Sequence, residues 1–557
     1  MTTTPKLRRA APSTIIRLLF TFAVLSAAAL TGCAGSARAA VQPTLQPTET
    51  AIPLVTPTTV PAPARVVLPA VDWTDVSIHR EAMKPAFAAD VDAFVDANRY
   101  LIIARLDLEP NREAQDAVIR GAQRVRYINR SADALDVIVF RLYANTPALG
   151  GRMNIAHVTA DGAEVAPSLS ALGSVMGVPL AQPLLPGEAV EITIDFTLVM
   201  VGGLNTSYGR FGYVDDVVSA TAWYPTLSVY ESGQGWWDSM PSPQGDPAYT
   251  ETGLYDVRLT LPADMMVAMS GVIVETTPNP DGTITYRDVT GPMRDHAFQA
   301  SARYMITEAE ADGTRINVVH YRDRADDPTD GTPNVVRFSV LALETFNAVF
   351  GEYPYAELDV VQNPTPSGVE FPGLIQIAAR AWVRGDPFLE VVIAHEIGHQ
   401  WFYALVGNNQ VEHPWLDESL TSYTEIVYMR AADPAGQRAQ RHIADFERDY
   451  SRFTGSGQPD LPLDMPVYRY FGYAYGAIVY RKGPLFYVEL ERLLGRDTVY
   501  AVLAEYYQRH RYEVVTSRDV EQAFADVSGQ DVSRVFAEWV YGIRPEATPT
   551  PTAGAEG

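Results

Sequence analysis

Apolar and polar positions alternate in short runs between about residues 90 and 305. The runs are RYLIIARLDL, AVIRGAQRVRYIN, LDVIVFRLYA, VEITIDFTLVM and LYDVRLTLPADMMVAMSGVIVE, and Gly, Pro, Asn and Asp separate them. β-branched and aromatic residues at a period of two are typical of strands that bury one face. This region predicts an all-β domain of two packed sheets. Between Gly202 and Gly245, glycine and aromatic residues predict an irregular loop that either lines a cleft or packs on the surface.

The pattern becomes helical after about residue 325. In NVVRFSVLALETFNAVFGEYPY, apolar residues recur at helical spacing up to a glycine. Strands are predicted around LDVVQN and LIQIA, before the next helix. Further helices are predicted over residues 387–405, 415–431, 474–494, 497–510 and 517–541. The predicted fold class is multidomain α+β, with an all-β domain over residues 71–310 and a mostly helical domain with a small sheet over residues 311–543.

The beginning of the chain has the features of a secretory signal. Four basic residues precede the apolar run LLFTFAVLSAAAL at residues 18–30, which is short for a membrane span. The sequence LTGC follows directly, and Cys33 is the single cysteine of the chain. This arrangement resembles the lipobox of bacterial lipoprotein signals, in which cleavage precedes a cysteine that receives lipid. The alternative is a signal-anchor helix with an incidental cysteine.

The lipobox resemblance implies where the mature protein is held. Residues 1–33 would be a lipoprotein signal peptide, and lipid on Cys33 would anchor the protein on the extracytoplasmic side of the cell membrane. Residues 34–70 are rich in Pro and Thr, which predicts a disordered linker between the membrane and the folded part. Residues 544–557 have the same character and are predicted to be a disordered tail.

The charge balance excludes one class of partner. The chain has 43 Lys and Arg against 67 Asp and Glu, and 43 − 67 gives a formal net charge of −24. A surplus of negative charge repels phosphate backbones, so nucleic acid is excluded as a partner.

The stretch VVIAHEIGHQWF, residues 391–402, carries candidate metal chemistry. On a helix, positions i and i+4 lie about 6 Å apart along the axis on one face, so His395 and His399 can turn toward one zinc ion. Glu396 would stand beside the metal as the general base for the attacking water. The alternative is an amphipathic helix with two incidental histidines. Its apolar neighbours count against that, because buried histidines need partners that a metal would supply.

A catalytic zinc needs a third protein ligand. The next predicted helix begins at HPWLDESLTSYTE, and a short loop would bring Glu418 back toward the two histidines. Two His and one Glu with an open position form a catalytic zinc set, so we predict one zinc ion per chain. Asp417 and Glu425 are expected beside the ligands or on the helix surface, and His413 in a loop, without catalytic roles.

Four motifs in order resemble one enzyme family. HEIGHQWF followed by WLDESLTSY is similar to the aminopeptidase N family of zinc metallopeptidases, within the thermolysin-like gluzincins. PSGVEFPGLI stands where this family carries a Gly-x-Met-Glu-Asn motif, and YAYGAIVYRKGPLF resembles its Tyr-x-Lys-Gly segment. The resemblance extends from about residue 95 to 542. It implies that the all-β domain is the family's saddle and the helical domain its thermolysin-like catalytic domain.

The resemblance also implies roles for individual residues. Glu370 matches the glutamate that holds the free amino terminus of the substrate, and Gly368 opens the same substrate-binding motif. Tyr480 matches the tyrosine that stabilises the oxyanion of the tetrahedral intermediate. Val369 and Phe371 depart from the family's Met and Asn, and the lost amide removes a hydrogen-bonding group near the substrate.

These features predict a zinc-dependent peptidase that removes amino-terminal residues from peptides or proteins outside the cell. The alternatives are a metallo-endopeptidase of the same fold and a non-catalytic surface scaffold. A scaffold would need neither Glu396 nor the zinc ligands. No oligomeric state is predicted.

Overall fold

The computed structural model describes residues 66–108, 116–200, 210–240, 242, 244–364 and 366–543. These residues belong to one compact unit. The predicted signal peptide with Cys33, the linker as far as residue 65 and the tail over 544–557 lie outside the described residues. Within the described ranges, no helix is long and apolar enough to cross a membrane.

An eight-stranded sheet dominates the first part of the chain, as the alternating runs predict. Its strands lie in the order β16-β17-β14-β1-β2-β8-β4-β5, and β1 and β14 pair in parallel while the other neighbours are antiparallel. The strands are β1 (Asn98–Leu108), β2 (Ala117–Ile128), β4 (Arg152–Ala160), β5 (Ala163–Glu164), β8 (Ala189–Met200), β14 (Gly253–Pro262), β16 (Val272–Pro278) and β17 (Thr283–Val289). Two short 3-10 helices, Ser77–Ala82 and Pro85–Phe94, precede β1.

Three smaller sheets accompany the large one, so the expectation of two sheets was wrong. One sheet has the order β15-β18-β10-β9, another β11-β3-β7-β6, and the third pairs β12 with β13. Their strands are β3 (Leu135–Arg141), β6 (Ser168–Ser170), β7 (Val175–Leu184), β9 (Phe211–Val214), β10 (Val217–Ala220), β11 (Thr226–Leu227), β12 (Tyr230–Glu231), β13 (Gly235–Trp236), β15 (Met266–Met269) and β18 (Phe298–Ser301). Most of these strands have two to four residues, too few to show a period of two.

A five-stranded mixed sheet follows, in the order β19-β20-β21-β23-β22. Its strands are β19 (Tyr304–Ala311), β20 (Thr314–Tyr321), β21 (Glu357–Asn363), β22 (Gly368–Phe371) and β23 (Leu374–Ala378). Sheet membership therefore changes just before Tyr304, slightly ahead of the predicted domain boundary at residues 310/311. The strand β22 lies at the edge of this sheet and carries the predicted substrate residues.

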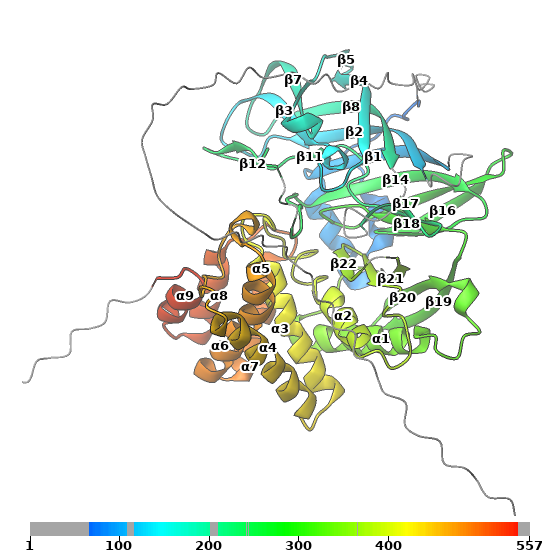
Figure 1. The fold of residues 1–557 in the computed structure, drawn as a ribbon. Helices are drawn as coiled ribbons and strands as arrows, with labels where there is room; N and C mark the ends of the chain where they lie inside the picture. The colour runs from blue at the N-terminus through cyan, green and yellow to red at the C-terminus, as the bar shows by residue number, and fades with distance from the viewer. Residues whose placement is uncertain are drawn as a thin grey trace, which may run out of the picture. The chain divides into compact units, whose positions relative to one another are not determined.

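The rest of the described chain is mainly helical. In Figure 1, α3 to α9, coloured yellow to red, lie together, while α1 and α2 lie beside the sheet of β19 to β23. The helices are α1 (Thr332–Phe350), α2 (Pro387–Gly398), α3 (Trp415–Ala432), α4 (Gln437–Gly455), α5 (Ala474–Ala477), α6 (Gly483–Leu494), α7 (Arg496–His510), α8 (Ser517–Ser528) and α9 (Ser533–Trp539), with a π-helical turn over Ile478–Lys482. A strand-rich part and a helical part with a small sheet confirm the predicted α+β class.

Helix boundaries differ from prediction at three places. The helix expected over 387–405 ends at Gly398, and the one expected over 517–541 breaks at Gly529, whose φ of 65° is left-handed. Helix α4 was not predicted, although Ala439, Ile443, Phe446, Tyr450 and Phe453 form an apolar stripe at helical spacing. Polar residues fill most positions between them, so the segment as a whole is hydrophilic and its apolar stripe was not recognised.

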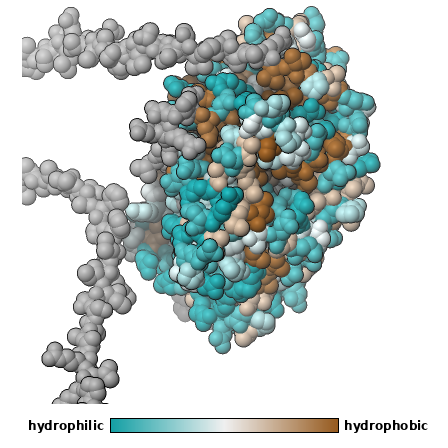
Figure 2. Space-filling model, turned by 90° about the vertical axis from the view of Figure 1, so that its right-hand side faces the viewer, coloured by the Kyte–Doolittle hydropathy of each residue, from teal (hydrophilic) through white to brown (hydrophobic). Residues whose placement is uncertain are grey.

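The exposed surface mixes polar and apolar side chains. On the face shown in Figure 2, hydrophobic groups lie in small patches between hydrophilic ones. Among the described residues, Phe471 and Tyr473 are the most exposed aromatic side chains, at 81% and 91%. Both lie in the loop before α5.

Candidate metal centre

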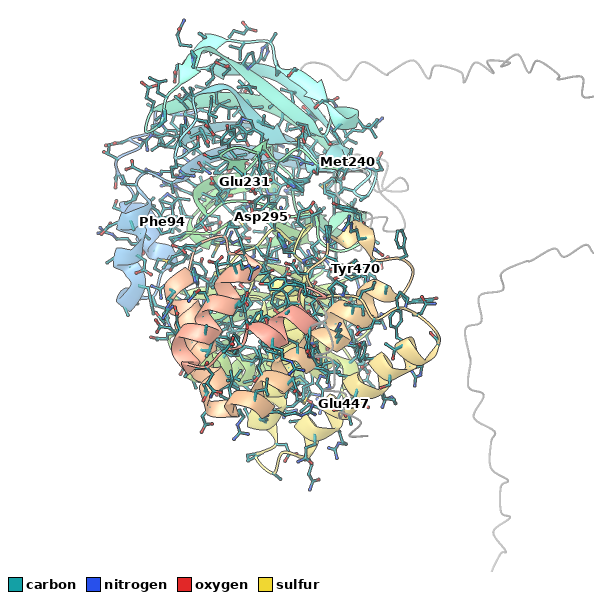
Figure 3. The ribbon with its side chains drawn as sticks, turned by 90° about the vertical axis from the view of Figure 1, so that its left-hand side faces the viewer. Phe94, Glu231, Met240, Asp295, Glu447 and Tyr470 are labelled. Atoms are coloured by element: carbon teal, nitrogen blue, oxygen red, sulfur yellow. The ribbon has the colours of Figure 1, made fainter. Side chains whose placement is uncertain are left out.

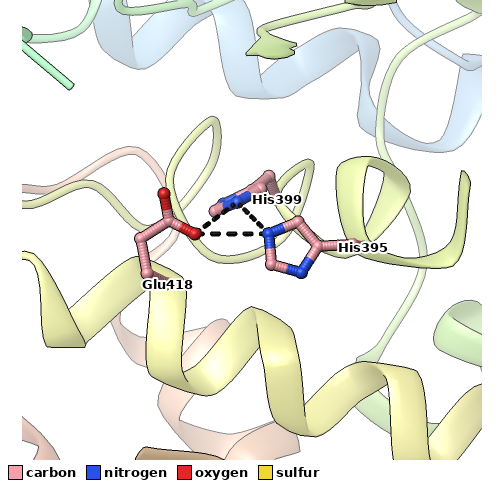
Figure 4. Close-up of side chains that lie close together, drawn as sticks. All are labelled: His395, His399 and Glu418. Atoms are coloured by element: carbon pink, nitrogen blue, oxygen red, sulfur yellow. Dashed lines mark hydrogen bonds and ion pairs between the residues drawn. The ribbon is translucent and has the colours of Figure 1, made fainter. Parts of the chain in front are cut away.

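Three predicted ligands meet between α2 and α3. His395 and His399 lie on the last turn of α2 and at its C-cap, and Glu418 lies in the first turn of α3. The Nε2 atoms of the two histidines are 3.2 Å apart, and they lie 3.2 and 3.3 Å from Glu418 Oε2. Figure 4 shows the three side chains pointing toward one another. This is the convergence that the spacing of HExxH and Glu418 predicts.

The donor set fits a zinc ion. Two imidazole nitrogens and one carboxylate oxygen within 4.8 Å of one another match the ligand types of catalytic zinc sites. The outer nitrogens are held by other groups, because His395 Nδ1 lies 2.8 Å from Glu425 Oε1 and His399 Nδ1 lies 3.2 Å from the carbonyl oxygen of Phe402. Each Nδ1–H donates to an oxygen, which leaves each Nε2 lone pair free for a metal.

Close packing of two helices sets this geometry. Gly398 lies against α3, where an added Cβ would come within 2.3 Å of Thr424 Oγ1. Thr421, on the same face of α3, places its Oγ1 3.1 Å from His399 Nδ1. A glycine at 398 therefore allows α2 to approach α3 closely enough for Glu418 to reach both histidines.

A hydrogen-bonded chain leads from one histidine to the cavity wall. Glu425 accepts from His395 Nδ1 through Oε1, and its Oε2 lies 2.5 Å from His442 Nε2 on α4. Although burial raises it, the hydrogen bonds from His395 and His442 lower the pKa of Glu425 to about 2. Glu425 is thus an ionised carboxylate that orients a ligand without being one. The role of His442 was not predicted, because α4 itself was not.

Glu396 is a buried carboxylate at the same site. Its Oε2 has no hydrogen-bond partner among the described residues, and its side chain lines the large cavity that also reaches the histidines. Burial raises the pKa of Glu396 to about 8. An added Cβ at Gly368 would stand 2.0 Å from Glu396 Oε1, so the strand β22 runs directly against this carboxylate. Gly368 leaves the space that Glu396 occupies.

Tyr480 reaches the centre from the π-helical turn. Its hydroxyl donates to Glu418 Oε1 at 2.5 Å, and its ring stacks on that of His395 with centroids 6.0 Å apart. An α-helix would separate Tyr475 and Tyr480 by about 140° around its axis, whereas the wider turn brings both into the cavity lining. The two rings meet edge to face at 5.6 Å. Sequence reasoning did not find Tyr475.

A charged recess lies at one end of the cavity. The carboxylate oxygens of Asp246, Glu370 and Glu418 lie within 4.8 Å of one another. Arg210 Nη1 pairs with Asp246 Oδ1 at 2.6 Å, and both side chains are 12% exposed. Burial raises the pKa of Asp246 to about 7 although Arg210 lowers it, so a cation entering the recess would favour the ionised form.

Part of the loop region left open by the sequence lines this recess. Arg210, Ser242, Gln244 and Gly245 all contribute to the cavity wall. Gln244 Nε2 donates to the backbone carbonyl oxygens of Val467 at 3.1 Å and of Tyr470, labelled in Figure 3, at 2.7 Å. The loop is thereby joined to the helical part of the chain. No motif in the sequence marked Arg210 or Asp246, because Arg210 pairs with Asp246 across 36 positions, and Asp246 meets Glu370 and Glu418 from more than a hundred positions away.

The cavity is large enough for a peptide. Its volume is about 830 Å³, and it extends from Asp246 and Glu370 past the two histidines to Phe446 on α4. Asp417, by contrast, is buried behind the ligands, where Gln410 Nε2 and Asn408 Nδ2 donate to its two oxygens at 2.7 and 3.0 Å. His413 lies in the loop before α3 and pairs with Asp464 at 2.6 Å.

The helical part of the chain matches a known domain model. Residues 338–539 match the peptidase family M1 domain. This segment is thus similar to M1 domains. It contains α2, α3 and the π-helical turn, and with them the two histidines, Glu396, Glu418 and Tyr480.

Curated proteins similar to the chain are aminopeptidases. Aminopeptidase N of Lactococcus lactis subsp. cremoris is 32% identical over 162 residues, which are 29% of this chain and 19% of that protein. Leucine aminopeptidase 2 of Coccidioides immitis is 29% identical over 295 residues, covering 50% of this chain and 45% of that protein. The chain thus spans about a fifth to just under half of the length of these relatives.

A solved M1 protein shares the fold over most of the chain. The M1 zinc metallopeptidase from Deinococcus radiodurans superimposes with a TM-score of 0.59 at 18% identity, covering 82% of this chain and 95% of that one. A mutant of that protein bound to a Tyr-Ser-Ala substrate gives a TM-score of 0.60. The β-rich part ahead of the M1 domain therefore belongs to the shared architecture.

Proposed function

We propose that the protein is a zinc-dependent aminopeptidase that removes single residues from the free amino terminus of peptides. The observation that carries this proposal is the joining, in one cavity, of a His-His-Glu metal centre with a buried acidic recess. The M1 domain and the aminopeptidases similar to it support the proposal.

The metal centre supplies the electrophile. A zinc ion held by His395, His399 and Glu418 would polarise the scissile carbonyl group and the attacking water. Glu396 Oε2, buried and without a hydrogen-bond partner among the described residues, accepts the proton of that water and returns it to the leaving amine nitrogen. Burial raises the pKa of Glu396, and the charge of a nearby zinc ion would oppose that rise and favour the ionised form that accepts the proton.

Tyr480 is the candidate donor to the oxyanion. Its hydroxyl donates to Glu418 Oε1 and must turn toward the substrate oxygen for this role. Tyr480 and Glu418 both line the cavity, so a substrate there would lie within the same space as the hydroxyl.

The recess explains why a free amino terminus would be required. Glu370 and Asp246 bring two carboxyl groups against one guanidinium, that of Arg210, so a substrate ammonium group completes the charge balance. The Arg210–Asp246 pair lines the same cavity as Glu370, so these charges stand where the amino terminus would bind. A peptide can extend its backbone along the edge strand β22, with its first residue at Glu370.

The test is a cleavage panel of free and amino-acetylated peptides with the zinc-loaded protein and with Glu396→Gln. We expect stepwise release of amino-terminal residues from free peptides and none from acetylated ones. Glu396→Gln should keep one zinc per chain and lose at least about a hundredfold in kcat, because general base catalysis is removed. Internal cleavage of acetylated peptides by the wild type would replace the proposal with an endopeptidase.

We further infer that the protein is held outside the cell by lipid on Cys33, which lies outside the described residues. The apolar run before LTGC and the single cysteine support this inference. In cells fed with a labelled fatty acid, the wild type should carry label and Cys33→Ala should not. Equal labelling of the two would contradict it.

A further inference from the structure

The amide of Gln410 bridges two buried carboxylates. Gln410 lies on the loop between α2 and α3 and is 1% exposed. Its Nε2 lies 3.1 Å from Glu370 Oε1 and 2.7 Å from Asp417 Oδ2. Both partners are carboxylate oxygens, which accept hydrogen bonds, so the nitrogen faces them and uses both of its hydrogens.

Glu370 needs such a donor because of its surroundings. Its carboxylate oxygens lie within 4.8 Å of those of Asp246 and Glu418. Like charges at this distance in a buried site repel one another and would turn a free carboxylate away. The neighbours of Glu370 on β22 supply no side-chain hydrogen-bond donor, since Val369 and Phe371 are apolar and buried in a hydrophobic cluster.

From these contacts we propose that Gln410 is the positioning residue of the amino-terminus recess. The Gln410 amide holds Glu370 in place by donating a hydrogen bond to Glu370 Oε1. Glu370 Oε2 is then directed to the ammonium group of the substrate. The bond is made before the substrate arrives, so binding need not pay to order the Glu370 side chain. This inference rests on the proposed aminopeptidase function and names the group that sets its amine recognition.

The same amide ties the recess to the metal centre. Asp417 directly precedes the ligand Glu418, and the bond from Gln410 links it to Glu370 on a different element. The distance between the amine anchor and the metal ligands is thereby fixed through one side chain. That distance determines which peptide bond lies at the metal, so Gln410 contributes to the removal of one residue at a time.

The chain offers a matched control. Asn408 lies two residues earlier, is 3% exposed, and donates through Nδ2 to the other oxygen of Asp417 at 3.0 Å. Among the described residues, its amide nitrogen donates to Asp417 and to the carbonyl oxygen of His413, and not to Glu370. Substituting Asn408 therefore disturbs Asp417 and the bond to the His413 carbonyl but leaves Glu370 its donor, whereas substituting Gln410 disturbs Asp417 and Glu370 together.

The experiment compares Gln410→Met with Asn408→Leu in the zinc-loaded full chain. Methionine has nearly the length of glutamine but donates no hydrogen bond. We expect Gln410→Met to raise KM for a free-amine peptide by about tenfold with kcat within about twofold, since the loss falls on binding of the amine. Asn408→Leu should leave KM unchanged, and zinc content should be one per chain in both.

Gln410→Asn is the second variant, for the case that Gln410→Met does not fold. Its shorter side chain keeps the amide but cannot span both carboxylates, so a smaller rise in KM is expected. An unchanged KM in a folded, zinc-loaded Gln410 variant would overturn the inference, as would an equal rise in Asn408→Leu. Failure of the proposed function is distinguishable, because it would show in the wild type as no release of amino-terminal residues.

Discussion

Some residues of this site pack so closely against a neighbouring side chain that one added methyl group would not fit. Gly368 is the clearest example, because its Cα lies against the carboxylate of Glu396. Its φ is not in the left-handed region, so the glycine serves close approach rather than backbone conformation. The residue that the family resemblance assigned to substrate binding thus has a second task, which is to leave space for the general base.

Gly368→Ala should displace Glu396 without removing it. The added methyl carbon would stand 2.0 Å from Oε1 and 2.4 Å from Cδ of Glu396, so the carboxylate must move from its position beside the metal centre. We expect kcat to fall by about a hundredfold or more, as when a general base is lost, with one zinc retained per chain. Steady-state kinetics and metal analysis measure both.

A matched glycine variant separates this effect from a general one. Gly455→Ala, at the end of α4, meets no atom within 4 Å and should keep wild-type kinetics. Wild-type kcat in Gly368→Ala would show that Glu396 has freedom to move and would count against the packing argument.

At the scale of elements, the site depends on how closely helices approach α3. Trp415 to Met429 are all buried, so α3 is surrounded by other elements. Gly398 of α2 and Gly483 of α6 are the points of close contact, with an added Cβ at 2.3 Å from Thr424 Oγ1 and at 2.0 Å from Ser419 Oγ, respectively. Gly398 therefore sets the spacing of α2 and α3, which hold the metal ligands, and Gly483 sets that of α3 and α6, which follows the π-helical turn with Tyr480.

Gly483→Ala should destabilise the protein through this contact. The new methyl group would also come within 3.0 Å of the Cα of Ser419, which is backbone and cannot rotate away. Overpacking of this kind costs about 1–3 kcal/mol, so the midpoint of thermal unfolding should fall. Differential scanning calorimetry measures the change.

Gly476→Ala is the control from the neighbouring α5. An added Cβ there meets nothing within 4 Å, and alanine is favoured over glycine in a helix by up to about 1 kcal/mol. Its midpoint should be unchanged or higher. A fall of equal size in both variants would refute the contact between α6 and α3 as the cause.

For the molecule as a whole, a buried histidine far from the metal centre makes stability depend on pH. His79 is 2% exposed, and its Nδ1–H donates to the carbonyl oxygen of Thr290 at 2.8 Å. Burial lowers the pKa of His79 to about 4 from its usual value near 6.5. Between these values the unfolded chain binds a proton that the folded chain does not, so stability falls as the pH drops from about 6.5 to about 4.

His79→Asn should remove this dependence, because the amide keeps a donor near the position of Nδ1 but does not titrate. Going from pH 7 to pH 5 should cost the wild type about 2 kcal/mol more than the variant. The unfolding midpoints of both proteins at the two pH values test this. A parallel loss in wild type and variant would show that His79 is not the group responsible.

Local pattern was sufficient for much of the molecule. Several elements lie close to their predicted positions, namely the strands β1, β2, β8 and β14 and the helices α1, α3 and α7. They could be predicted because apolar residues on a buried face recur with a period of 2 in strands and 3.6 in helices. The His-His-Glu set was also readable, since two ligands share one helical turn and the third opens the next helix.

Only the tertiary structure decided the rest of the site. Arg210 and Asp246, the amide of Gln410, the bond from His442 to Glu425 and the contact of Gly368 with Glu396 join residues from separate elements. Such contacts give no periodic pattern or motif in the sequence. Neither partner stands out among its sequence neighbours, and the two meet only because the fold brings their elements together. The sequence by itself determined the metal chemistry, while the packing of the β-rich part and the loops around that centre determined how a substrate would be held against it.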